Sequence, residues 1–116
     1  NACNCSMIHL MLALKQAGHK DTKSVLAAWK ATLDEQRALY RNGPLFRREL
    51  GDAAAFEGDF AAAKTHYAVA MDAGWRAALF LNQSAYGFLP KDFDALRMRM
   101  RTLINRERTA LDMPPL

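Results

Sequence analysis

The sequence predicts an all-α protein, and three observations lead to this prediction. Apolar residues recur at three- and four-residue steps over most of the 116 residues, which is the period of an amphipathic helix. Alanine, the strongest helix former, is abundant. No stretch alternates cleanly between apolar and polar residues, as a half-buried strand would.

Length and composition indicate a single globular domain, because a hydrophobic content of 51% suffices for a packed core. A net charge of +4 is too small to indicate nucleic acid by itself. No apolar run reaches the roughly 18 residues that a membrane span requires. The most apolar stretch, Met7 to Leu14, lacks the basic flank of a secretion signal. We therefore expect a cytoplasmic protein without membrane contact.

The first two predicted helices form one pair. The first covers residues 5–17 and ends at Gly18, a residue suited to a helix C-terminus. The second has Asp21 or Thr22 as its N-cap and continues to about residue 41. The short glycine turn between them favours an antiparallel arrangement.

A second pair follows over residues 44–73. Pro44 stands at the first helical position of the third helix, where its missing N–H costs nothing, and Gly58 ends that helix. Asp59 is the predicted N-cap of the fourth helix, which covers residues 60–73.

The helical pattern weakens over residues 75–90, where we expect a short helix at 76–81 and then a loop. Asp92 is the predicted cap of a last helix that runs from residue 93 to about 111. Met98 lies beside its packing stripe and is expected to be exposed. The stripe itself consists of Leu96, Met100, Leu103, Ile104 and Leu111.

The two turn glycines lie 40 residues apart, a spacing typical of helical repeats. Around the second turn, small residues stand where helices must approach closely, and one large aromatic residue fills the space beside them. These repeat-packing residues are Leu50, Gly51, Gly58, Ala63, Tyr67 and Ala70.

The stretch from Leu50 to Met71 resembles the tetratricopeptide repeat (TPR). It departs from the family pattern at Arg47, where the family favours Trp, and at Ala54, where it favours Tyr. Residues 5–41 match the pattern only in degenerate form. The resemblance implies a TPR-like solenoid fragment of antiparallel helix pairs, with residues 91–111 as a C-terminal capping helix.

A second resemblance lies in the C-terminal half. Residues 73–76 read Ala-Gly-Trp-Arg, and Leu89-Pro90 and Phe93-Asp94 follow. This order is similar to the closing segment of TPR-like domains at the C-termini of bacterial adenylate cyclases and signal-responsive transcriptional regulators. It implies a non-catalytic protein-interaction or regulatory scaffold module whose catalytic or DNA-binding parts lie upstream. The initial Asn1-Ala2 is interpreted as a cloning scar.

In the TPR family the first helix of each pair lines a peptide-binding groove. Carried over by position, the candidate groove consists of Ile8, Leu12, Leu45, Arg48, Asp52 and Phe56. Family members that grip a peptide carboxylate use a Lys and an Asn there. Arg48 and Asp52 occupy the comparable positions here, so we expect them to pair with each other as residues four apart on a helix do.

The apolar face of the first helix is wider than one packing contact needs, at about 200° of its circumference. A preceding repeat or a second copy of the chain would cover the surplus, so a homodimer through this helix is one expectation. The last helix folding back over it is the alternative. The candidate self-association face consists of Met7, Ile8, Met11 and Leu12.

The sequence contains no catalytic or cofactor-binding motif, so we expect no enzyme activity and no cofactor. Cys3 and Cys5 are too few ligands for a metal site, even with His9 nearby. His66 is expected to be a solvated surface residue. The partner is expected to be a protein, either another copy or another polypeptide.

Two other functions compete with protein binding. The last helix carries five arginines, and residues 96–116 have a net charge of +3, which suits nucleic acid, although no aromatic residue is interleaved. Residues 44–74 carry −2, so the arginines have an intramolecular alternative. A small helical ligand-binding domain, with a cavity near Trp29, Trp75 and Tyr86, is the other competitor.

Overall fold

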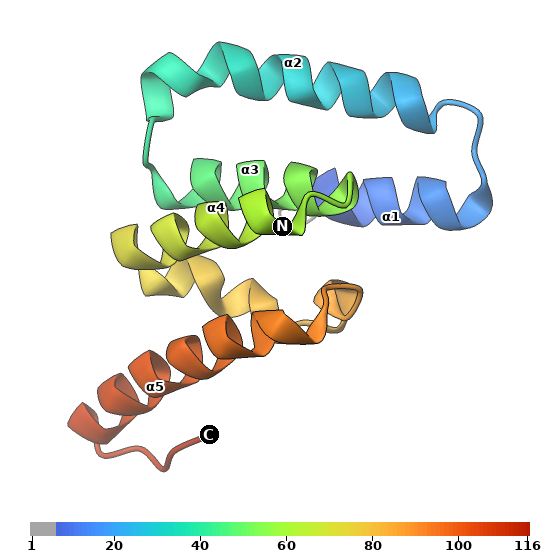
Figure 1. The fold of residues 1–116 in the computed structure, drawn as a ribbon. Helices are drawn as coiled ribbons and strands as arrows, with labels where there is room; N and C mark the ends of the chain where they lie inside the picture. The colour runs from blue at the N-terminus through green and yellow to red at the C-terminus, as the bar shows by residue number, and fades with distance from the viewer. Residues whose placement is uncertain (1–6) are drawn as a thin grey trace.

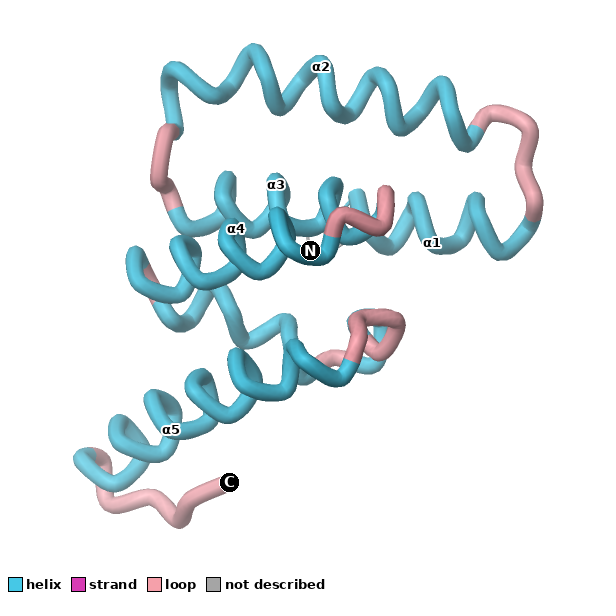
Figure 2. The backbone as a smooth tube through the Cα atoms, viewed as in Figure 1, coloured by secondary structure: helices cyan, strands magenta, loops and turns pink. Residues whose placement is uncertain are grey.

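The computed structural model describes residues 7–116, without the side chains of Trp75, Ala77, Ala78 and Asn82. The prediction of an all-α fold is confirmed, since the described chain contains helices and loops and no strand (Figure 2). The α-helices are α1 (Met7–Ala17), α2 (Thr22–Tyr40), α3 (Pro44–Phe56), α4 (Phe60–Ala73) and α5 (Asp94–Ala110). Between α4 and α5 lie three short 3-10 helices, η1 (Trp75–Asn82), η2 (Ser84–Tyr86) and η3 (Lys91–Phe93).

The helices stack in three levels (Figure 1). Helix α2 runs along one side and spans both α1 and α3, while α4 lies beside α3. Helix α5 lies on the side away from α2, and the 3-10 segment η1–η2 connects it to α4. The segment from residue 75 to residue 93 is thus placed between the α3–α4 pair and the last helix.

Two groups of buried side chains hold these levels together. The first group fixes α2 over α1 and α3 and consists of Met11, Trp29, Leu33, Phe46, Leu50 and Ala53. The second joins α1, α3 and α4 to the C-terminal segment. Its largest members are Ile8, Tyr67, Met71, Phe80, Leu81, Tyr86, Leu89, Phe93, Met100 and Ile104.

The predicted turn between α3 and α4 is confirmed in detail. Gly58 has a φ of +85°, a left-handed conformation that residues with a Cβ adopt only with strain. The side chain of Asp59 caps α4 by accepting a hydrogen bond from the backbone N–H of Ala62 at 3.2 Å. Helix α4 begins and ends at the predicted residues.

Two other predicted caps differ in detail. Asp21 stands at the N-cap position of α2 as predicted, but its side chain makes no capping hydrogen bond, and the hydroxyl of Thr22 donates to the carbonyl of His19 at 2.7 Å. Asp92 does not cap α5 either, because it lies in the 3-10 turn before that helix and pairs with Lys64 on α4. The Asp92 carboxylate therefore forms an ion pair with Lys64 and does not cap α5.

The packing stripe predicted for α5 is confirmed at its centre and wrong at its end. Met100 and Ile104 are buried, and Met98 is 71% exposed as expected. Leu111, by contrast, is 64% exposed because α5 ends at Ala110. The expectations for Asn1, Ala2, Cys3 and Cys5 lie outside the described residues. No described helix has the length and apolar character needed to cross a bilayer.

Candidate functional site

Most of the predicted repeat-packing residues lie where α3 meets α4, while Leu50 packs in the group that holds α2 and Gly58 lies in the exposed turn. Leu50, Gly51, Ala63, Tyr67 and Ala70 are all buried. A Cβ atom placed on Gly51 would stand 2.5 Å from the Tyr67 ring, closer than any real contact. The absent side chain of Gly51 is therefore what admits the aromatic ring between the helices.

The residues of the predicted peptide groove are mostly inaccessible. Ile8 and Asp52 are fully buried. Leu12, Arg48 and Phe56 are half-buried, and Leu45 alone of the six is exposed. A partner would reach most of this face only after another part of the chain moved away.

The part of the chain that covers this face is the 3-10 segment. The ring of Tyr86, on η2, lies edge-on to His9 of α1, with 6.3 Å between ring centres. The guanidinium of Arg48 lies 5.4 Å from the centre of the Phe80 ring on η1, a cation–π distance. The face that α1 and α3 would offer to a peptide is thus occupied from within the molecule.

Asp52 lies at the centre of this contact. Its Oδ1 accepts a hydrogen bond from the Tyr67 hydroxyl at 2.7 Å, and its Oδ2 accepts one from the Tyr86 hydroxyl at 3.1 Å. One carboxyl group therefore connects α3 to both α4 and η2. The expected partner, Arg48, is more distant, with its Nε 4.0 Å from Oδ2.

Burial raises the pKa of Asp52 from 3.8 to about 7, although the hydrogen bonds from the tyrosines and the charge of Arg48 act in the opposite direction. Burial likewise raises the pKa of Tyr67 well above its ordinary value, and the neighbouring Asp52 adds to this effect. Tyr67 therefore serves as a neutral hydrogen-bond donor. The two hydrogen bonds of Asp52 join α3 to α4 and η2. Because Asp52 is fully buried, it has no access to a substrate.

The predicted self-association face lies largely inside the protein. Ile8 and Met11 are fully buried, and Met7 and Leu12 are half-buried. Trp29 and Leu33 of α2 pack beside Met11. Ile8 packs in the group that holds Phe80 and Tyr86. The apolar face of α1 is covered on one side by α2 and on the other by the 3-10 segment, while Leu10 stays 46% exposed.

An exposed apolar surface lies elsewhere, at the corner where α2 ends and α3 begins. Leu39 is 78% exposed, Leu45 is 65% exposed, and Tyr40 is also exposed. We call Leu39, Tyr40 and Leu45 the corner surface. Beside it lies a depression of about 350 Å³, lined by Gln36, Tyr40, Leu45, Phe46, Arg48 and Glu49. The Tyr40 and Phe46 rings, which both line it, have their centres 6.1 Å apart.

Several arginines of α5 make intramolecular contacts. Arg97 donates to the carbonyls of Leu81 and Tyr86, each at 3.0 Å. Arg99 pairs with Asp72 on α4, and Arg76 of η1 pairs with Glu107. The Arg99–Asp72 ion pair thus joins the basic residues of α5 to the acidic segment 44–74.

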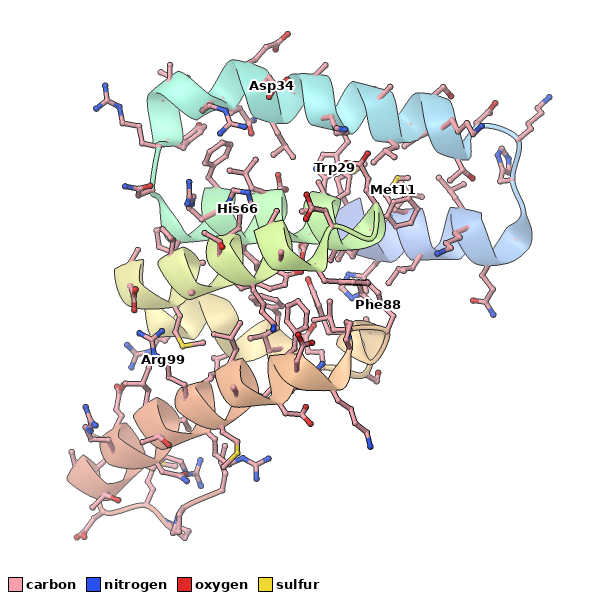
Figure 3. All side chains as sticks on the ribbon, in the orientation of Figure 1. Met11, Trp29, Asp34, His66, Phe88 and Arg99 are labelled. Carbon is pink, nitrogen blue, oxygen red and sulfur yellow. The ribbon has the colours of Figure 1, made fainter. Side chains whose placement is uncertain are left out.

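His66 differs from its prediction, since it is half-buried on the side of α4 toward α2 rather than solvated (Figure 3). The described residues contain no group of three His, Cys, Asp or Glu side chains that could hold a metal ion. Trp29, near which the competing ligand-binding interpretation placed a cavity, is buried between helices.

Two features of the site were not predicted from the sequence. The pairing of Asp52 with Tyr86 joins residues 34 positions apart, and no local period indicates such a contact. The buried position of Asp52 did have a signal, because it follows Gly51 on the face that packs against α4. No family model, curated protein or solved structure matches this chain.

Proposed function

We propose that this chain is a non-catalytic protein-interaction module, a TPR-like C-terminal part of a larger bacterial signalling or regulatory protein. The observation that carries the proposal is the corner surface with its adjoining depression. Large aliphatic and aromatic side chains exposed together on a small domain are typical of sites where proteins bind.

The shape of the site supports binding of a short peptide segment or loop. The depression has room for one apolar side chain of a partner, which would pack against Tyr40, Leu45 and Phe46. Arg48, Glu49 and Gln36 supply hydrogen-bonding groups at its margin. An apolar centre with a polar margin is the usual anatomy of a protein interface.

The resemblance to the TPR family supports a protein-interaction module, but the binding surface proposed here differs from the peptide-binding groove of that family. The faces of α1 and α3 toward the C-terminal segment are occupied by Phe80 and Tyr86. We therefore assign partner binding to the corner surface, which requires no part of the fold to move. A role in nucleic-acid binding is less favoured, because Arg97 and Arg99 already bond within the protein.

The test is a selection of binding peptides against the immobilised chain from a random displayed library. We expect enriched peptides to carry an aromatic or aliphatic anchor. Their affinity should fall at least about tenfold for Leu45→Ser, because a buried apolar side chain contributes roughly 1.5–3 kcal/mol.

Met98→Ser is the matched control, since Met98 is equally exposed but lies on α5, away from the corner. Its peptide affinity should be unchanged. Failure to enrich any peptide, or equal loss with both variants, would contradict the proposal. Sedimentation velocity of the same samples shows whether a second copy of the chain occupies the corner surface, in which case Leu45→Ser would dissociate the dimer.

A further inference from the structure

The depression beside the corner surface has two charged residues in its lining, Arg48 and Glu49. Arg37 and Arg41, which lie at the end of α2, do not line it, and Arg37 pairs with Asp34. The charge that the depression offers to a partner therefore depends on what Arg48 and Glu49 contact within the protein.

The guanidinium of Arg48 is held by contacts inside the protein. Its Nε is buried and lies 4.0 Å from Oδ2 of Asp52. Its guanidinium carbon lies 5.4 Å from the centre of the Phe80 ring on η1. Neither Asp52 nor Phe80 lines the depression, so these contacts direct the positive charge toward the interior and η1.

The carboxylate of Glu49 has no comparable contact. The residue is half-buried, and its side chain forms no hydrogen bond or ion pair with any other described residue. A carboxylate that has lost part of its hydration is stabilised by a cation that reaches it. Glu49 therefore provides the charge in the depression that is available to a partner.

The position of Glu49 on α3 fixes where a cationic group would lie. Glu49 follows Leu45 by four residues and so stands on the same face of the helix. An anchor packed on Leu45 would be about one helical turn, or about 5.4 Å, from Glu49. Because an extended chain advances about 3.3 Å per residue, a side chain one or two positions from the anchor would reach the carboxylate.

Lysine and arginine fit this place better than other residues. Their aliphatic stems pack on apolar surface while the charged head stays in a polar setting, and Leu45 and Tyr40 offer such a surface. A cation beside the Tyr40 ring is also favoured by the charge distribution of the ring.

We propose that the partner segment carries a lysine or arginine one or two residues from its apolar anchor, and that Glu49 binds the charged head of this side chain. The inference rests on the proposed function, because it names the partner chemistry of the same surface. A segment with an acidic residue in that place would be repelled by Glu49, so this contact also selects against wrong partners.

The experiment selects displayed peptides, with one fixed leucine as the anchor and all other positions randomised, against the immobilised whole chain. We expect lysine or arginine to be enriched one or two positions from the anchor. Synthetic copies of these peptides should bind Glu49→Gln about fivefold more weakly, the upper end for a solvent-accessible ion pair. A selection against Glu49→Lys should instead enrich aspartate or glutamate at the same positions.

Glu35→Gln is the matched control, because it removes the same charge from an exposed position of α2 that does not line the depression. Its peptide affinity should be unchanged, and amide spectra of each variant report whether the fold is retained. Weaker binding to Leu45→Ser with unchanged binding to Glu49→Gln would overturn this inference and leave the proposed function standing. An equal loss with Glu35→Gln would also overturn it, because the effect would then come from net charge. Enrichment of no peptide would overturn both proposals.

Discussion

The α3–α4 pair and helix α2 are attached to the protein in different ways. In α3, six of 13 residues are buried, and the helix approaches α4 closely through Gly51. In α2, which has 19 residues, only Trp29 and Leu33 are buried. The indole N–H of Trp29 is also buried without a hydrogen-bond acceptor among the described residues.

This difference shows how residue size decides the mode of packing. Small residues let two helix backbones come together, so that many side chains contribute a little each. Large side chains keep two helix backbones further apart, and a few of them contribute most of the buried area that stabilises the contact. The α3–α4 pair is therefore closely packed through small residues. Helix α2 is attached chiefly by two buried side chains, with Val25 and Leu26 half-buried beside them, and leaves the corner surface exposed at its end.

Trp29→Ala tests the dependence of α2 on one side chain and has the largest expected effect. Removing a buried tryptophan costs about 3–5 kcal/mol. We expect native-state hydrogen exchange to show that α2 opens while the amides of α3 and α4 keep their protection. Equal loss of protection in all three helices would contradict the contrast between them. Because alanine is a better helix former than tryptophan, opening of α2 in Trp29→Ala would report lost packing and not lost helix propensity.

Gly51→Val tests the close approach of α3 and α4. The new side chain would overlap the Tyr67 ring, which hydrogen bonding to Asp52 holds in place. We expect a loss of about 1–3 kcal/mol in urea unfolding, the usual cost of overpacking. Ala61→Val, at an exposed position of α4, adds a similar bulk without overlap and should change stability by less than about 0.5 kcal/mol. An equal loss of stability in both variants would show that the close approach of α3 and α4 does not restrict the size of residue 51.

Asp52→Asn tests the carboxyl group that joins the pair to η2. Its pKa is about 7 in the folded state and 3.8 as a free side chain, so the folded protein binds this proton more tightly. The stability contributed by this proton is complete below pH 3.8 and is lost as the pH rises through about 7. Between pH 5 and pH 8 the native protein should lose about 2 kcal/mol more than the variant.

Urea unfolding of both proteins at the two pH values measures this difference. His66 and every other titrating group are common to both proteins, so their contributions cancel. Parallel pH profiles would show that Asp52 does not take up a proton near neutrality. Tyr86→Phe serves as a further comparison, because it removes one donor and leaves the carboxyl group in place.

The sequence predicted the elements well wherever the signals were local. Both ends of α4 were predicted correctly, because the signals from Gly58, Asp59 and the alanine-rich helical pattern act within a few residues. The short helix predicted at 76–81 lies within η1, but η2 lies in the segment predicted as a loop, where it packs in the group of distant buried residues around Tyr86. Asp92 and His66 were misjudged for the same reason, as their surroundings come from other helices.

The sequence by itself determined the helices, the turn at Gly58 and the small residues that let α3 meet α4, because these depend on backbone conformation and side-chain size. Tertiary structure alone decided which apolar faces remain accessible. It placed Phe80 and Tyr86 against the predicted groove, buried Asp52 between two tyrosines and exposed Leu39 and Leu45. Burial is a property of the whole packing arrangement, and a helical period does not indicate which distant segment will cover a given face.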